Sequence, residues 1–229
     1  MLAKRASRKK KENTRVQNQA LPRLRNARAA CAGPRPKHRP DVSNTAELAE
    51  LVIEKMKHHN APITSEIIRL ADKHIPVGLG IKEHPDDDWP EIAQKIQAAD
   101  ILLFATPIWW GNRSSLMQRF IERMDSFDEQ YIAGGRSVLY NKVAGVVVTG
   151  SEDGALAAMG TIMMVLTWLG FTLPPECAAY WVGEVGQPTN QDGEKRRGNS
   201  ATQHMTKNLA RNLMYYAQLL KKHPLIVKK

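Results

Sequence analysis

The sequence predicts an α/β fold in which a parallel sheet is covered by helices on both faces. Two apolar runs, Ile101–Ala105 and Val143–Val148, lack the polar and apolar alternation of a half-exposed strand, as expected of strands buried on both faces. Segments with helical periodicity lie between these runs, and strands that alternate with helices are typical of parallel sheets. The 229 residues suffice for one domain of ordinary size or for two small ones.

The first half of the chain supplies two helices and a strand around a long loop. Good capping residues precede Ala46–His59, whose apolar residues recur at helical spacing. Thr64–Leu70 is a short β-rich run that predicts a strand. The loop 71–88 ends in three aspartates, and Asp88 is expected to cap a helix that starts with Trp89-Pro90 and runs to about Ala99.

After the strand Ile101–Ala105, the second half alternates in the same way. Ser114–Phe127 is predicted to be one amphipathic helix. Ala155–Leu169 is hydrophobic nearly all round, which predicts burial in the core or in a subunit interface. A last strand is expected around Ala178–Val182, and a final amphipathic helix from Ala201 to Lys221.

The positive charge is concentrated in the first 40 residues. They hold 13 of the 33 Lys and Arg residues and one of the 23 acids, so the other 189 residues carry 20 basic and 22 acidic side chains, a net of −2. We therefore expect a basic, disordered extension over residues 1–40 and one domain over residues 41–229. Contact with nucleic acid is expected only through residues 1–40, because the main domain is nearly neutral.

Composition excludes several other classes of protein. No apolar run approaches the roughly 18–20 residues of a membrane-spanning helix. The two cysteines, Cys31 and Cys177, are too few for a disulfide framework, which favours a cytoplasmic protein. The chain has neither GxGxxG nor a Walker phosphate loop, its histidines lack metal-ligand spacing, and Cys177 has no histidine partner in sequence. We therefore expect no metal site and no catalytic nucleophile.

Ligands of parallel sheets bind beyond the carboxyl ends of the strands, so the loops after the strands are the candidate sites. The loop after Ile101–Ala105 contains two adjacent tryptophans that could stack on a flat aromatic ligand, or pack on a helix or a partner subunit. Backbone N–H groups around its glycine could bond to the edge of a heterocycle. The candidate residues of this loop are Pro107, Ile108, Trp109, Trp110 and Gly111.

Two further loops are candidates. The loop after Val143–Val148 has two glycines that allow close approach of a ligand, although Asp153 is equally suited to capping the next helix. Its candidate residues are Gly150, Ser151, Glu152, Asp153 and Gly154. At the start of the first helix, Ser43, Asn44 and Thr45 could bind a phosphate with Arg39 beside them, or could form only a capping cluster.

Residues 41–182 resemble the NADPH-dependent FMN reductase family of the flavodoxin-like superfamily. The resemblance is carried mainly by Trp89-Pro-Glu-Ile, by Ala99-Asp-Ile-Leu-Leu-Phe-Ala-Thr-Pro-Ile-Trp-Trp-Gly111 and by Thr149-Gly-Ser-Glu-Asp-Gly154. It implies a three-layer sandwich with a five-stranded parallel sheet of order 2-1-3-4-5 and FMN at the switch point. Arg39 and Ser43–Thr45 would face the phosphate, Pro107–Gly111 would flank the isoalloxazine, and Gly150–Gly154 would approach its other side.

The resemblance also implies the chemistry. The chain would be an FMN-dependent oxidoreductase that passes hydride from NAD(P)H to FMN and on to a flavin, a quinone or a similar acceptor, with no catalytic side chain. Dimers or tetramers are common in the family. A nitro- or azo-compound reductase, a flavodoxin-like electron carrier, and a nucleic-acid-associated protein that acts through its basic tail stay open as alternatives.

The family's first strand is not matched. Residues 25–39 hold five cations and two prolines, and Pro36-Lys37 stand where the family has a Gly-Ser pair. A central parallel strand tolerates neither feature, so we expect the first strand to be degraded or absent. A shifted reading frame or altered gene start over residues 1–38 would explain this departure.

Overall fold

The computed structural model describes residues 27–31, 43–59, 62–135, 137–184 and 192–226. Apart from its residues 27–31, the basic extension expected over residues 1–40 lies outside this described part, and so does Arg39. Among the described helices, none carries an apolar stretch that would cross a lipid bilayer.

The centre of the fold is a parallel sheet in the order β2-β1-β3-β5-β6, with the short strand β4 paired antiparallel to β3. With that short strand left aside, the order is 2-1-3-4-5, as the resemblance implied. The strands are β1 (Ala27–Cys31), β2 (Ser65–Arg69), β3 (Ile101–Trp109), β4 (Asn112–Arg113), β5 (Val143–Gly150) and β6 (Ala178–Val182).

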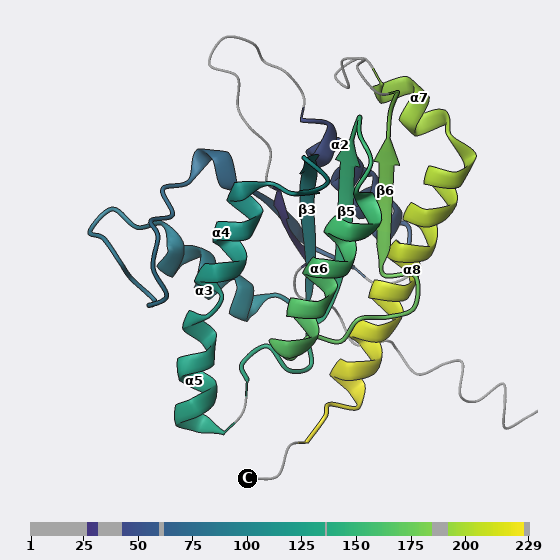
Figure 1. Ribbon diagram of the computed structural model, residues 1–229. Coiled ribbons are helices and arrows are strands. Elements are labelled where there is room, and N and C mark those ends of the chain that lie inside the picture. Colours follow the sequence, from purple (N-terminus) through teal and green to yellow (C-terminus); the bar gives the residue numbers. More distant parts are fainter. Residues whose placement is uncertain (1–26, 32–42, 60–61, 136, 185–191, 227–229) are drawn as a thin grey trace, which may run out of the picture.

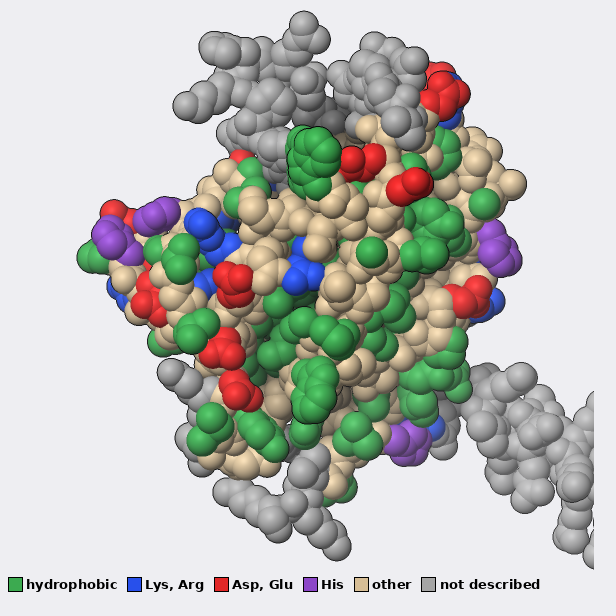
Figure 2. Space-filling model, viewed as in Figure 1, with side chains coloured by type: hydrophobic (Ala, Val, Ile, Leu, Met, Phe, Trp, Pro, Cys, Tyr) green, Lys and Arg blue, Asp and Glu red, His purple; other side chains and the backbone are tan. Residues whose placement is uncertain are grey.

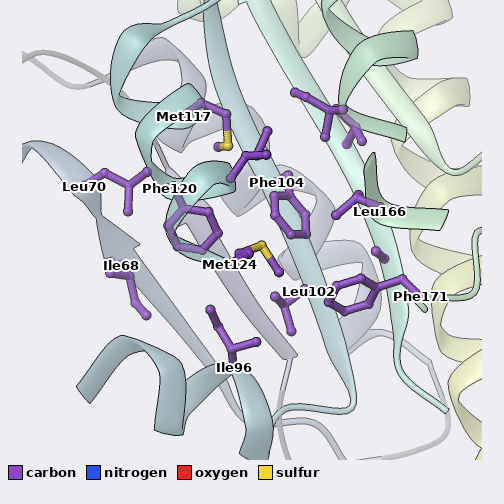
Figure 3. Close-up of a cluster of buried hydrophobic side chains, with 14 of the residues drawn as sticks. Ile68, Leu70, Ile96, Leu102, Phe104, Met117, Phe120, Met124, Leu166 and Phe171 are labelled. Carbon is purple, nitrogen blue, oxygen red and sulfur yellow. The ribbon is translucent and has the colours of Figure 1, made fainter. Parts of the chain in front are cut away.

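Helices cover both faces of this sheet and complete three layers (Figure 1). They are α2 (Asn44–Lys57), α3 (Trp89–Ala98), α4 (Ser115–Arg123), α5 (Ser126–Gly134), α6 (Ala155–Trp168), α7 (Gly193–Gly198) and α8 (Ser200–Lys222), and a 3-10 turn covers Leu70–Asp72. Side chains of α2 and α8 build the apolar core on one face. Those of α3, α4 and α6 build the core on the other face, where Phe104 of β3 packs against Phe120 and Phe171 (Figure 3).

The expectation that the first strand is degraded or absent is wrong. Ala27–Cys31 forms β1, which pairs in parallel with β2 on one side and β3 on the other, so it lies in the middle of the sheet. The strand has only five residues, which include one cation and no proline. The prediction counted cations and prolines over the fifteen residues 25–39. Alanine has a low β propensity, but pairing on both sides outweighs it. The presence of β1 removes one of the two grounds for a frame error over residues 1–38, and the other, Pro36-Lys37, lies outside the described residues.

The predicted helix over Ser114–Phe127 is interrupted, and this prediction was also wrong. The break lies between Arg123 and Ser126, where α4 ends and α5 begins. The Ser126 hydroxyl donates to the backbone carbonyl of Arg123, 2.8 Å away, and accepts from the indole Nε1–H of Trp89 at 2.9 Å. A side chain that takes a backbone carbonyl in this way competes with the helical hydrogen-bond ladder.

Asp88 holds the N-cap position of α3, as expected, but its side chain makes no capping hydrogen bond, and the first helical amide is bonded instead by Asp87. The Oδ1 of Asp87 accepts from the amide of Trp89 at 2.8 Å, and its Oδ2 lies 2.7 Å from Nη2 of the fully buried Arg123. Burial raises the pKa of the Asp87 carboxyl, but hydrogen bonds from Arg123 and from the amides of Glu83 and Trp89 outweigh it, so the pKa lies below its ordinary value. This buried pair joins the loop before α3 to α4.

The helix that is hydrophobic nearly all round, for which burial in the core or in a subunit interface was expected, is buried on one face within this chain. In α6, Ala158, Ile162 and Leu166 are fully buried against the sheet, whereas Leu156, Met164 and Trp168 are exposed. Figure 2 shows apolar side chains gathered over α6 on the face that it presents to the viewer. Single exposed apolar residues are ordinary, but three on one helix at spacings of eight and four residues form a candidate contact surface.

Candidate functional site

The candidate loops meet at the edge of the sheet to which the strand arrows point (Figure 1). This edge lies beyond the carboxyl ends of β3 and β5 and beside the start of α2. A buried hydrogen bond joins two of these elements, since the hydroxyl oxygens of Thr45 in α2 and Thr149 in β5 are 2.6 Å apart. The structure therefore brings together the residues at the start of α2, in the loop after β3 and in the loop after β5.

At the start of α2, a side chain caps the helix and the first backbone amides have no partner within the helix. Ser43 is the N-cap, and its hydroxyl accepts from the amide of Ala46 at 3.3 Å. Thr45 points inward to Thr149, and Asn44 accepts a hydrogen bond from Arg196 of α7. The first amides of a helix lack intrahelical partners and, with the helix dipole, favour an anion. Of the four predicted phosphate residues, Ser43, Asn44 and Thr45 lie at this helix start, and their contact with a phosphate stays a prediction.

The double tryptophan forms the end of a β-hairpin. Strand β3 reaches Trp109, the chain turns through Trp110 and Gly111, and β4 pairs back with Trp109 facing Asn112. The φ angles of Trp110 and Gly111 are 49° and 73°, the two positive values of a type I′ turn. A left-handed conformation costs a tryptophan about 1–2 kcal/mol, and such strain is concentrated at functional sites.

The hairpin leaves both indoles accessible. Trp110 is 92% exposed and Trp109 is 53% exposed, so the packing of both indoles on a neighbouring helix, considered from the sequence, is not what the described residues show. A large apolar ring held outside the core by a strained turn offers a flat wall to a ligand. Nearby, Nη1 of Arg113 is buried without a hydrogen-bond partner among the described residues.

The loop after β5 holds this hairpin in place. The carboxylate Oε1 of Glu152 accepts from the backbone amide of Trp110 at 2.6 Å, so this candidate residue has its partner in the loop after β3. Gly154 has φ of 119°, and a Cβ placed there would lie 2.4 Å from Cα of Gly111. Gly154 is also the N-cap position of α6, so Asp153 does not take the capping role considered for it.

Gly150 explains a second close approach between the same loops. A Cβ on Gly150 would lie 2.8 Å from Cδ1 of Ile108, so the absence of a side chain lets the ends of β5 and β3 pack at contact distance. Pro107 continues the same pairing, since it lies opposite Thr149 in the ladder. The two predicted flavin-facing loops are therefore packed directly against each other.

An ionic cluster that the sequence did not reveal lies behind the start of α2. The carboxylate of Glu47 contacts the guanidinium of Arg196 and accepts from Nε of Arg197 at 2.8 Å. Burial raises the pKa of the Glu47 carboxyl, but Arg197 and Arg196 outweigh it, so the pKa is lowered and the group stays ionised. The only sequence signal was the basic run Lys195-Arg196-Arg197, which reads equally well as a solvated face.

Two more buried polar atoms at this end lack hydrogen-bond partners among the described residues: Trp181 Nε1 and Asp192 Oδ2. A Cβ on Gly183 would lie 2.2 Å from Asp192 Oδ2 and 3.7 Å from Trp181 Nε1, so both atoms face the chain just after β6. Within the described ranges, no group of three or more His, Cys, Asp or Glu side chains is arranged to hold a metal ion.

Comparison with known proteins places these loops in a family context. The model of the family "NADPH-dependent FMN reductase" matches residues 29–184, more than half of the chain. The match begins inside β1, before the point at residue 41 where the resemblance in the sequence was expected to start. The strand that seemed to be missing is thus part of the matched region.

Two curated proteins are similar in sequence. A divalent metal cation transporter, MntH, from Mycobacterium bovis is 33% identical over 208 residues, which is 88% of this chain and 30% of that protein. The 8-demethyl-8-aminoriboflavin-5'-phosphate synthase of Streptomyces davaonensis is 32% identical over 171 residues, which is 71% of this chain and 66% of the synthase. The chain therefore spans less than two thirds of either relative.

A solved structure shows the same architecture with a flavin bound. The crystal structure of RosB with the bound intermediate 8-demethyl-8-formylriboflavin-5'-phosphate superposes with a TM-score of 0.76 at 28% sequence identity. The superposition covers 88% of this chain and 82% of that one.

Proposed function

Because this chain belongs to the NADPH-dependent FMN reductase family, whose members are FMN-dependent oxidoreductases, we propose that it is an FMN-dependent NAD(P)H oxidoreductase. It would accept hydride from the nicotinamide and pass the electrons on to a flavin, a quinone or a similar small acceptor. The observation that carries the proposal is the strained hairpin, whose exposed Trp110 is fixed by Glu152 on the same sheet edge as the free amides at the start of α2.

The described residues fit FMN. A phosphate needs hydrogen-bond donors and positive potential, which the first turn of α2 supplies after its Ser43 cap. An isoalloxazine needs a flat apolar wall and close backbone approach, which Trp109, Trp110 and the glycine-bearing loop after β5 supply. Arg39, predicted to assist the phosphate, lies outside the described residues and stays a prediction.

The chain's own residues act by binding and orientation. When bound, FMN supplies the redox chemistry, because its ring accepts and returns a hydride. The amides at the start of α2 would bind the phosphate and Trp110 would shield the ring from water, while Glu152 holds the turn that carries Trp110. No side chain of the described site needs to act as an acid or a base.

The test is reconstitution of the purified chain with FMN, followed by anaerobic mixing with NADPH and, separately, with NADH. Bleaching of the flavin band by either coenzyme, followed by recovery on addition of a quinone or free flavin, is the expected result. Flavin that binds but bleaches only with dithionite would replace this proposal with an electron carrier. Protein that takes up no FMN would refute it.

A second candidate is an enzyme for which a phosphorylated flavin is the substrate. It is favoured by the Streptomyces davaonensis synthase and by the RosB complex, which are similar to this chain in sequence and in fold. The two candidates differ in what happens to the ring. Mass spectrometry of flavin recovered after turnover would show unchanged FMN for the oxidoreductase and a modified flavin for the second candidate.

We also propose that the chain self-associates through α6. Leu156, Met164 and Trp168 follow one another at spacings of eight and four residues, and Trp168 is 87% exposed. Such a stripe is self-complementary about a two-fold axis and loses its contact with water on pairing. Trp168→Glu is expected to convert the dimer or tetramer to monomer in light scattering. An unchanged mass in that variant, or a monomeric wild type, would contradict the proposal.

A further inference from the structure

We propose that Arg196 is a ligand of the flavin's 5′-phosphate and makes the site selective for FMN over riboflavin. This inference rests on the proposed function. It concerns a residue of α7, which follows the last strand and lies at the carboxyl end of the sheet, as the start of α2 does (Figure 1).

The guanidinium of Arg196 reaches the start of α2. Its Nη2 donates to Oδ1 of Asn44, the first residue of that helix, at 3.3 Å, and it contacts the carboxylate of Glu47 one turn further on. The Arg196 side chain is 1% exposed. A buried cation is therefore fixed within hydrogen-bonding distance of the helix end that is suited to an anion.

The second terminal nitrogen of the same guanidinium is without an acceptor in the described part of the chain. Nη1 of Arg196 is buried and makes no hydrogen bond to the residues that the structure describes. A buried N–H group without an acceptor is costly, and a guanidinium presents a fork that matches two phosphate oxygens. A phosphate at the first turn of α2 would supply the acceptor that Nη1 lacks.

The surrounding charges leave Arg196 attractive to an anion. Glu47 divides its carboxylate between Arg196 and Arg197, so it does not neutralise both. Arg197 has a further partner in Glu54, which lies ten residues along α2 from Asn44, about 15 Å at the helical rise. The Oδ2 atom of Asp192 has no hydrogen-bond partner among the described residues and lies against Gly183. 

Arg197 provides a matched control. It is the next residue of α7, has the same charge and pairs with the same Glu47, but its side chain is 43% exposed and its other partner is Glu54 rather than Asn44. Replacing Arg197 thus removes an equal charge from the same cluster but leaves the contact between Arg196 and Asn44 in place.

The experiment compares the Kd values for FMN and riboflavin, measured by quenching of flavin fluorescence with the full chain. For Arg196→Gln, we expect FMN affinity to fall about 10- to 100-fold, as for loss of a charge-assisted contact, with riboflavin affinity changed by less than about 3-fold. Arg197→Gln is expected to change both affinities by less than about 3-fold. Equal losses for FMN and riboflavin, or no loss, would overturn the proposal.

A third variant separates ligand binding from support of the fold. Glu47→Gln removes the carboxylate that competes for Arg196 while leaving the guanidinium in place. FMN binding that is unchanged or tighter supports a phosphate contact, whereas a loss as large as that of Arg196→Gln would assign the residue a purely structural role. If Arg196→Gln does not fold, Arg196→Lys replaces it with the same criteria. Wild-type chain that binds neither flavin would refute the proposed function itself.

Discussion

Gly154 offers the sharpest test of the idea that the two glycine-bearing loops form one site. It is the position at which the loop after β5 touches the hairpin that carries Trp110. In Gly154→Ala, the new methyl group would lie 2.4 Å from Cα and 2.6 Å from the carbonyl carbon of Gly111. Both atoms belong to backbone, so neither can move aside as a flexible side chain can.

Two costs follow from the geometry. The φ of 119° lies outside the regions that alanine adopts readily, which costs about 1–3 kcal/mol if the conformation is retained. The overlap with Gly111 adds roughly 1–3 kcal/mol of the kind found on overpacking a core. The total approaches about 2–6 kcal/mol, so we expect the loops to separate rather than bear it, and the separation moves the turn that Glu152 holds.

The assay combines thermal unfolding with FMN titration. For Gly154→Ala, the unfolding midpoint is expected to fall by several degrees, since 1 kcal/mol corresponds to about 2–4 °C in a domain of this size. FMN affinity is expected to fall at least about tenfold. Gly160→Ala is the control: it lies in the same helix with open space around it, so it should stabilise by about 0.5–1 kcal/mol and leave FMN binding unchanged. Wild-type stability and affinity in Gly154→Ala would refute the reasoning.

Three further predictions concern the turn and the buried ion pair. Glu152→Ala removes the acceptor of the Trp110 amide and should weaken FMN binding about 3- to 10-fold in the same titration, whereas Glu152→Gln, which keeps an acceptor, should weaken it less. Arg123→Met leaves the buried Asp87 carboxylate without its cation and should lower the free energy of unfolding by about 3–5 kcal/mol in chemical denaturation; a loss below 1 kcal/mol would contradict this. Because the folded-state pKa of Asp87 is depressed, its contribution to stability is fully present above about pH 4 and is lost as the pH falls through the folded pKa; Asp87→Asn should therefore flatten the acid limb of stability measured from pH 7 to pH 3.

The elements with strong local signals were predictable from the sequence. The strands at Ile101 and Val143 are apolar on both faces, and the structure confirms them as neighbours in the sheet. The helices after them begin where polar or glycine residues permit a cap. The break between α4 and α5 was not predictable, because it depends on a hydrogen bond from Trp89, 37 residues away along the chain. Long-range partners of this kind leave no mark on local periodicity.

The candidate site divides in the same way. Each of its two loops is one continuous stretch of sequence that follows a strand. The sequence therefore predicted that the loop with Trp109 and Trp110 and the loop Gly150–Gly154 lie close together, and the structure places them in contact. That Glu152 would hold Trp110 was not, since the contact spans 42 residues, and Arg196 is 149 residues from the Glu47 that it contacts. Sequence patterns identify loops that bind ligands, whereas the contacts that fix those loops come from tertiary structure.

The first strand was mispredicted because the prediction relied on local composition, whereas the strand depends on pairing with its neighbours in the sheet. The window of residues 25–39 counted the five residues of β1 together with ten that lie outside the bounds of the strand. What makes Ala27–Cys31 a strand is its neighbours, since Ala29 lies between Ile67 on one side and Leu103 on the other. A strand in that position is supported by partners that lie far away in the sequence, which a local count of cations and prolines does not register.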